Sequence, residues 1–336
     1  MALGAVVLWC ALFAVLGAAG TWFARAYALR RNLMDAPGER RSHTVPTPRG
    51  AGIAIVLAML VALAALIARL PQELVLLAGT TIGLVLVAAI GWLDDHRPLS
   101  PWSRLAVHAL AAGWLAAGFW LSGSAGATAL MVFVAALVLV NAWNFMDGID
   151  AIAAGQAVVV VAALVLLAPH PLPVFLGLAF VAATLGFLPF NLPRARAFLG
   201  DVGSGSLGYL VALFAGLATR EAPVAAWSLV ALPLAPFLVD TGLTLVTRML
   251  RGERWWEPHV THAYQCAARR FGHGQVAIAY AVWAALGGTL AVWMAAGGAN
   301  REGSSMLLLA WFTLATLAWY AARRIGTPAV PDGARA

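Results

Sequence analysis

The chain contains no lysine, and only 10% of its 336 residues are charged. A soluble domain carries roughly 25% charged residues, so this composition excludes an ordinary soluble protein. The net charge of +7 comes from arginines in short gaps between apolar runs, which excludes the basic face of a nucleic-acid-binding domain. The two cysteines, Cys10 and Cys266, lie far apart, which argues against a disulfide framework or a cysteine-based metal site.

Apolar residues make up 62% of the chain, in runs close to the ~20 residues that cross a bilayer. They predict an all-α, polytopic membrane protein of ten or eleven spans, with one integral-membrane domain over residues 1–326 and a short tail over 327–336. The expected spans are residues 4–24, 52–69, 74–92, 105–121, 126–144, 155–169, 172–190, 204–219, 224–245, 276–296 and 306–321. Because no basic residue precedes the first run and Arg25 follows it, we interpret that run as an uncleaved span.

The arginines orient these spans. With the N-terminus on the periplasmic side, 18 of the 21 arginines fall in inside loops, and only Arg69, Arg220 and Arg301 fall outside. An arginine excess is typical of cytoplasmic loops. Five acids also gather at the cytoplasmic ends of the spans, namely Asp94, Asp95, Asp147, Asp150 and Asp201. Charge at such a depth is costly unless it faces a cavity or a cation, so we expect a shared cytoplasmic cleft.

The adjacent carboxylates of Asp94 and Asp95 end the third span, in GWLDDHRPLS. Two neighbouring acids repel each other, so the pair needs a cation or an arginine nearby. One carboxylate can bind a divalent metal while the other accepts a proton. The alternative is a solvated turn with Arg97 as the counter-ion.

A second polar motif, NAWNFMDGID, begins at the end of the fifth span and contains Asn141, Asn144, Asp147 and Asp150. If the helix persists, positions 144 and 147 share a face. Amide and carboxylate groups on one face suit a nucleoside-like ligand. An ordinary capped helix end is the alternative.

A third motif, NLPRARAFLGDVGSGSLG, places Asp201 and Ser204 in a Gly/Ser turn before the eighth span. Free N–H groups at a helix start favour phosphate, and an acid within such a cradle is best explained by a bridging metal. The motif lacks the Gly-Lys-Ser/Thr of a P-loop, and a flexible connecting loop is the alternative.

Two basic loops complete the set. The segment 246–275 contains Arg254, a candidate for phosphate binding, and the pair His259 and His262. No further soft ligand accompanies these histidines, which disfavours zinc. The first cytoplasmic loop, DAPGERRSHTVPTPRGAG, adds His43 and Arg49 as phosphate-seeking groups, or is simply a positive-inside loop.

Taken together, these stretches resemble the polyprenyl-phosphate N-acetylhexosamine-1-phosphate transferase family, glycosyltransferase family 4, which includes MraY, WecA and TagO. The likeness covers about residues 35–265, with five motifs in the same order. It implies a reaction at the cytoplasmic face of the bacterial inner membrane. There, a UDP-N-acetyl-sugar gives its sugar 1-phosphate to undecaprenyl phosphate with Mg²⁺, for which Mn²⁺ can substitute, and UMP is released. No nucleic acid takes part, and a homodimer is compatible with the sequence.

The resemblance also implies residue roles. Asp201, assisted by Asp94, would hold Mg²⁺, and either Asp94 or Asp95 would deprotonate the lipid phosphate, an assignment that stays open. His262 matches the first histidine of the family's terminal motif and is a further catalytic candidate. The expected substrate-binding residues are His43, Arg49, Asn141, Asn144, Asp147, Asp150, Asn191, Phe198, Ser204 and Arg254, of which Asn191 and Phe198 match positions that contact uracil.

Two departures from the family pattern narrow the expectation. The second and third histidines of the terminal motif are Tyr264 and Gln265 here, and a usual glycine is Ala151. The first departure argues against an MraY-type transferase for phospho-MurNAc-pentapeptide. It favours the WbpL-like branch that initiates O-antigen or similar surface polysaccharides.

A transporter or flippase for a lipid-linked or nucleotide sugar is the competing interpretation. A transporter would place its polar residues near the middle of the membrane and often show inverted halves, whereas here the acids gather at one face. A CDP-alcohol phosphotransferase would need a DGxxAR run that NFMDGID lacks.

Overall fold

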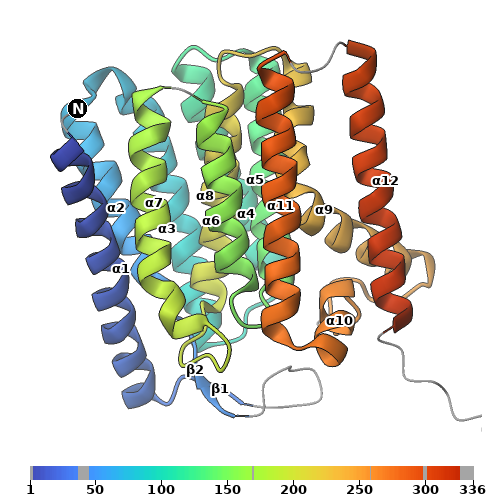
Figure 1. The fold of residues 1–336 in the computed structure, drawn as a ribbon. Helices are drawn as coiled ribbons and strands as arrows, with labels where there is room; N and C mark the ends of the chain where they lie inside the picture. Colours follow the sequence, from blue (N-terminus) through green and yellow to red (C-terminus); the bar gives the residue numbers. More distant parts are fainter. Residues whose placement is uncertain (1–2, 37–44, 169, 258, 298–300, 326–336) are drawn as a thin grey trace, which may run out of the picture.

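A computed structural model describes residues 3–36, 45–168, 170–257, 259–297 and 301–325 (Figure 1). The helices are α1 (Leu3–Arg31), α2 (Ile53–Arg69), α3 (Leu74–His96), α4 (Pro101–Leu121), α5 (Gly126–Met146), α6 (Ile152–Leu166), α7 (Pro171–Asn191), α8 (Gly200–Thr219), α9 (Trp227–Leu250), α10 (Ala263–Phe271), α11 (His273–Ala295) and α12 (Arg301–Ile325). Short 3₁₀ turns, η1 (Pro71–Glu73) and η2 (Val224–Ala226), precede α3 and α9. One antiparallel pair, β1 (Met34–Asp35) with β2 (Thr47–Pro48), is the sheet of the described residues.

Each of the eleven expected spans coincides with one of these helices, so the all-α, polytopic membrane fold is confirmed. Within the described part of the chain, nine helices are long and apolar enough to cross a membrane, while α2 and α6 are apolar but shorter. The sequence did not predict α10, which is short and amphipathic, or the β1–β2 pair. The expected tail at 327–336 lies outside the described residues.

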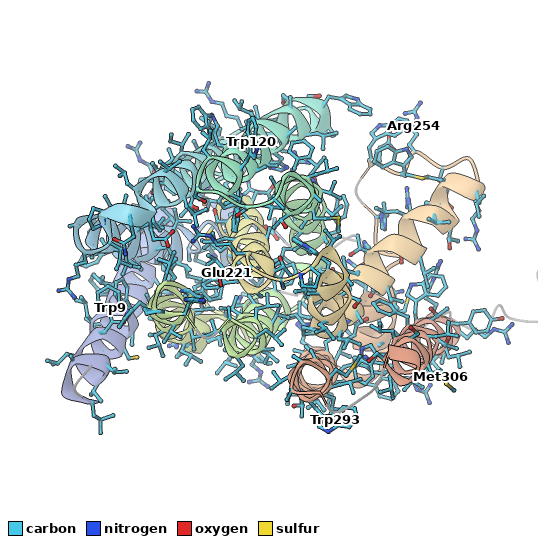
Figure 2. All side chains as sticks on the ribbon, turned by 90° about the horizontal axis from the view of Figure 1, so that it is seen from above. Trp9, Trp120, Glu221, Arg254, Trp293 and Met306 are labelled. Atoms are coloured by element: carbon cyan, nitrogen blue, oxygen red, sulfur yellow. The ribbon has the colours of Figure 1, made fainter. Side chains whose placement is uncertain are left out.

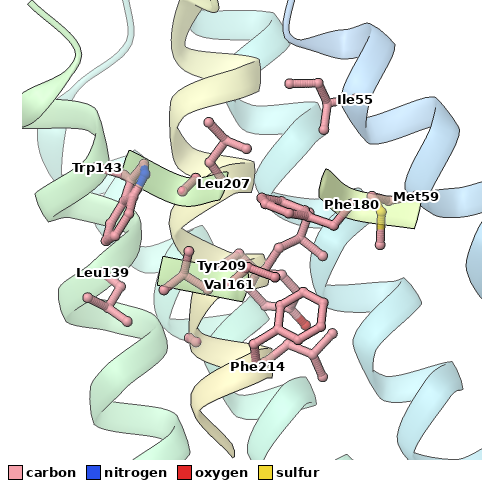
Figure 3. Close-up of a cluster of buried hydrophobic side chains, with 14 of the residues drawn as sticks. Ile55, Met59, Leu139, Trp143, Val161, Phe180, Leu207, Tyr209 and Phe214 are labelled. Atoms are coloured by element: carbon pink, nitrogen blue, oxygen red, sulfur yellow. The ribbon is translucent and has the colours of Figure 1, made fainter. Parts of the chain in front are cut away.

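Helix α8 forms the centre of the bundle, and 17 of its 20 residues are buried. A helix that is apolar on every side belongs inside a bundle, and the glycines of α8 let neighbouring backbones approach closely. A Cβ atom added to Gly208 would lie 2.2 Å from the Leu139 carbonyl oxygen of α5. Figure 3 shows Leu207, Tyr209 and Phe214 of α8 within the surrounding core. This packing fixes the depth and rotation of the first turn of α8.

The chain reaches α8 through a loop that pairs with residues 48–52. The backbone N–H groups of Ala51 and Gly52 donate to the carbonyls of Phe198 and Leu199, both at 2.9 Å. The Phe198 N–H donates in turn to Pro48 at 2.8 Å. Residues far apart in sequence therefore meet where α3 and α5 end and α8 begins. We call this end of the bundle the site end; β1, β2 and α10 lie there too (Figure 1).

Candidate active site

Three charged side chains form the centre of the site end. The Arg104 guanidinium donates through Nη1 to Asp94 Oδ2 at 2.9 Å and to Asp201 Oδ2 at 2.8 Å. Arg104 lies in the first turn of α4, which begins at Pro101 after the Ser100 cap. The two carboxylates come from the end of α3 and the start of α8. We call Asp94, Arg104 and Asp201 the carboxylate–arginine cluster.

Helix α5 supplies an amide to this cluster. Asn144 Nδ2 donates to Asp201 Oδ1 at 3.0 Å and to the buried hydroxyl of Ser204 at 3.1 Å. Both Asp201 oxygens therefore have a donor, and their orientation is defined by two different helices. The structure thus brings together four of the residues predicted from sequence, Asp94, Asn144, Asp201 and Ser204.

Asp95 differs from its neighbour Asp94, because it caps α8. Its two oxygens accept the backbone N–H groups of Asp201 at 3.0 Å and Val202 at 3.1 Å. Arg49 pairs with the Asp95 carboxylate at 4.0 Å and hydrogen bonds to its backbone carbonyl. Gly200 makes this approach feasible, since it has a φ of +69° and a Cβ there would lie 2.5 Å from the carboxylate. Asp95 is therefore a positioning residue, and it anchors the helix start that carries Asp201.

A cavity of about 220 Å³ extends from the cluster. Asn141, Asn144 and His108 line it together with Arg104 and Asp201. At its mouth, the exposed indole of Trp102 lies 6.3 Å from Trp255 and 6.1 Å from Trp256, measured between ring centroids. The cavity thus joins a charged end to an aromatic rim, and indole rings prefer the membrane–water interface.

The turn after α5 holds the other predicted acids. Asp147 is half-buried, and burial together with the negative charges of Asp201, Asp95, Asp35 and Asp150 raises the pKa of its carboxyl well above the ordinary value.

Asp150 has local partners, since it accepts the Ala195 N–H at 3.3 Å and pairs with His273 at 3.4 Å. Asn191 is buried and also joins two loops, because it accepts the Ala151 N–H at 3.1 Å and donates to Ala197 at 3.0 Å. Ala151, which replaces a usual family glycine, has a φ of 65°, a conformation that favours glycine.

The predicted His262 is buried beside the end of α5. Its Nδ1 lies 3.3 Å from Asp240 Oδ1, and its ring stacks on Phe145, which lines the cavity. Asp240 also accepts the first N–H groups of α10, from Ala263 and Tyr264, each at 2.9 Å. A carboxylate within the α9 span therefore fixes the histidine and the start of α10 together.

The remaining predicted residues have separate positions. Arg254 is exposed and pairs with Glu257 at 3.0 Å, and Figure 2 shows it at the periphery of the molecule. Phe198 is half-buried in the loop that pairs with residues 48–52. His43 lies outside the described residues. Burial, followed by the charges of His262 and Arg248, lowers the pKa of His259 to about 4.

Sequence analysis missed Arg104, Asp240 and the three cavity tryptophans as members of the site. Arg104 had a usable signal, because Ser100 and Pro101 mark a helix start that puts Arg104 in the first turn of the helix following the acidic pair. Asp240 had none, since its partners follow it by more than twenty residues.

The oxygen atoms of the cluster suit a hard cation. Within the described ranges, no three His, Cys, Asp or Glu side chains lie close enough to enclose a metal. Mg²⁺ does not need such an enclosure, because it is commonly held by one or two carboxylates together with substrate phosphates and water. Asp94 and Asp201, which the Arg104 guanidinium already holds together, fit that arrangement.

This fold and site define a polytopic membrane enzyme with an acidic centre at one end of its helical bundle. The glycosyl transferase family 4 model matches residues 77–219, the segment that supplies the cluster. This match supports the resemblance to polyprenyl-phosphate N-acetylhexosamine-1-phosphate transferases that the sequence shows.

Similar proteins include the decaprenyl-phosphate N-acetylglucosaminephosphotransferase of Mycolicibacterium smegmatis, 29% identical over 73% of this chain and 70% of that protein. A probable undecaprenyl-phosphate N-acetylglucosaminyl 1-phosphate transferase of Bacillus subtilis is 27% identical over 70% of each. A phospho-N-acetylmuramoyl-pentapeptide-transferase of a Synechococcus species is 38% identical, but over 40% of this chain and 35% of that protein.

Proposed function

We propose that this protein transfers N-acetylhexosamine 1-phosphate from a UDP-sugar to a polyprenyl phosphate in the bacterial inner membrane, with Mg²⁺, and releases UMP. The carboxylate–arginine cluster, at the charged end of a cavity with an aromatic mouth, carries this proposal. An oxygen of the lipid phosphate attacks the β-phosphorus of the UDP-sugar. The bond from that phosphorus to the bridging oxygen breaks, and UMP leaves with the bond's electron pair.

Phosphoryl transfer depends on positioning and on neutralisation of charge more than on covalent chemistry. Bound Mg²⁺ would neutralise the diphosphate, with Asp201 and Asp94 as its protein ligands. The chain's own residues hold that pair in place. Arg104 keeps the two carboxylates together, Asn144 orients Asp201, and Asp95 anchors the turn that carries it.

The aromatic residues at the cavity mouth support a lipid as the acceptor. Trp102 and Trp256 are exposed at the mouth, where a prenyl chain could lie against them while its phosphate reaches Arg104. The positive-inside distribution of the arginines supports a cytoplasmic position for this end, on the side where a UDP-sugar would be available.

Two residues support a branch distinct from MraY. Tyr264 and Gln265, at the positions of the second and third family histidines, each form a hydrogen bond within the protein here. The Tyr264 hydroxyl donates to the Phe145 carbonyl at 3.0 Å, and Gln265 accepts the His262 N–H at 3.3 Å. We therefore propose a WbpL-like role in priming an O-antigen or similar envelope polysaccharide. The relatives that cover most of the chain are named for N-acetylglucosamine phosphate transfer.

The test is UMP release by the detergent-purified protein with undecaprenyl phosphate, Mg²⁺ and a panel of UDP-N-acetylhexosamines. We expect UMP release with at least one sugar, and a loss of about 100-fold or more in Asp201→Asn. Glu221→Gln is the matched control, since this exposed acid pairs with His170 at the opposite end of the bundle. Movement of labelled substrate across a vesicle without UMP formation would instead establish a transporter.

A further inference from the structure

A second cavity lies between α9, α10, α11 and α12, and it shares no lining residue with the first. Its volume is about 340 Å³, within the roughly 300–1,000 Å³ that ligand pockets span. Most of its wall is apolar. Alanines of α12 form one side, and the aromatic residues of the wall are Phe271, Tyr280, Trp283 and Trp319.

The sequence of α12 explains why this space is open. Ala315, Ala318, Trp319 and Ala322 follow helical spacing, so three small side chains share the face that looks into the cavity. Towards the end of the bundle away from the site, Trp311 braces α12, because its indole N–H donates to the Leu232 carbonyl of α9 at 3.1 Å.

At the site end, α10 packs between α12 and the neighbouring helices (Figure 1). The Trp319 indole donates to Thr244 of α9 at 3.2 Å, which fixes the wall. These two hydrogen bonds fix the position of α12 relative to α9. Protein interiors are normally packed as densely as organic crystals, so an apolar space of this size between membrane helices calls for an occupant.

Positive charge surrounds the site end of this cavity. The Arg323 guanidinium lies 4.8 Å from the ring centroid of Trp319, and that of Arg270 lies 5.9 Å from the ring centroid of Phe271. Both rings line the cavity, so both arginines are held at its edge by side chains of the wall. Basic pockets between membrane helices on the cytoplasmic side are typical binding sites for anionic lipid headgroups.

We propose that this cavity binds one diacyl anionic phospholipid, with an acyl chain between α9 and α12 and the headgroup phosphate on Arg270 and Arg323. The acceptor lipid of the transferase reaction does not fit this role, because its phosphate must reach Arg104 and Asp201 in the other cavity. The wall includes the Asp240 carboxylate, which holds His262. A lipid in this cavity therefore lies on the opposite side of Asp240 from His262 and supports the position of that histidine. The site does not depend on the proposed reaction.

The test is native mass spectrometry of the delipidated full-length protein with phosphatidylglycerol or phosphatidylcholine added. We expect one tightly retained phosphatidylglycerol, and a loss of about tenfold in its retention in the double variant Arg270→Gln/Arg323→Gln. Arg31→Gln is the matched control, because Arg31 also lies over an aromatic ring, 6.0 Å from the Tyr27 centroid, but neither residue lines either of the two cavities. Phosphatidylglycerol should also raise the Tm of the wild type and of Arg31→Gln, but not that of the double variant.

A second pair of variants tests the acyl chain. Ala318→Trp fills the cavity and should abolish lipid retention, whereas Leu317→Trp, at an exposed neighbour outside the wall, should not. Equal retention of phosphatidylglycerol by the wild type, the double arginine variant and Ala318→Trp would overturn the proposal. So would equal retention of phosphatidylcholine by the wild type, or binding there of undecaprenyl phosphate in preference to phosphatidylglycerol.

Discussion

The guanidinium of Arg104 lies 2.8 Å from the carboxylate of Asp201, although 97 residues separate them in the chain. The same nitrogen contacts Asp94, so one guanidinium bridges two acids from two other helices and offsets one of their two negative charges. Opposite charge between two carboxylates favours their ionised forms, and it allows them to lie close together before any substrate arrives.

Arg104→Gln should therefore lower kcat by about 10–100-fold, since two unneutralised carboxylates repel each other and lose their alignment. The Mg²⁺ concentration for half-maximal activity should fall, because the acids lose their internal counter-ion. Arg104→Lys keeps the charge and should retain more activity. A Mg²⁺ titration of UMP release with the three proteins checks this, and an unchanged Mg²⁺ response in Arg104→Gln would contradict it.

Substitutions of Asp94 and of Asp95 should have different effects when stability and activity are measured on the same variants. Asp95→Asn leaves one acceptor for two N–H groups of α8, so it should cost about 0.5–2 kcal/mol of stability, as other lost caps do. Asp94→Asn keeps an acceptor for the Leu99 N–H and should change the Tm little while abolishing transfer. Thermal unfolding beside the UMP assay checks both variants. Equal loss of Tm in the two would show that the division of roles is wrong.

Asp147→Asn should stabilise the protein at neutral pH while it lowers activity. Burial and then neighbouring acids raise the pKa of Asp147 above its unfolded value, so the folded state holds this proton more tightly. The destabilisation begins as pH rises through the unfolded value, near 4, and grows until the folded pKa is passed. The variant should unfold at a higher Tm than the wild type at pH 7.5 and at the same Tm at pH 4. A Tm difference independent of pH would contradict this reasoning.

Asp240→Asn should displace His262, although Asp240 itself does not contact the substrate. The carboxylate accepts two N–H groups of α10 and the Tyr280 hydroxyl at 2.8 Å, so an amide there would place donors against donors. Hydrogen exchange over residues 259–271 should become faster, and activity should fall in parallel with His262→Gln. If only His262→Gln loses activity, Asp240 does not act through the histidine.

The amino-acid sequence by itself determined the membrane class, the eleven helices and the end of the bundle where the acids gather. Those features follow from local composition, because a run of apolar residues needs a membrane whatever its neighbours are. The tertiary structure decided which groups each of the two adjacent acids contacts. The sequence does not distinguish the adjacent residues Asp94 and Asp95. Only the position of Gly200 against α3 makes Asp95 the cap of α8. Partners such as Arg104 with Asp201, or Asp240 with His262, depend on the rotation and depth of packed helices, which no single segment of the chain specifies.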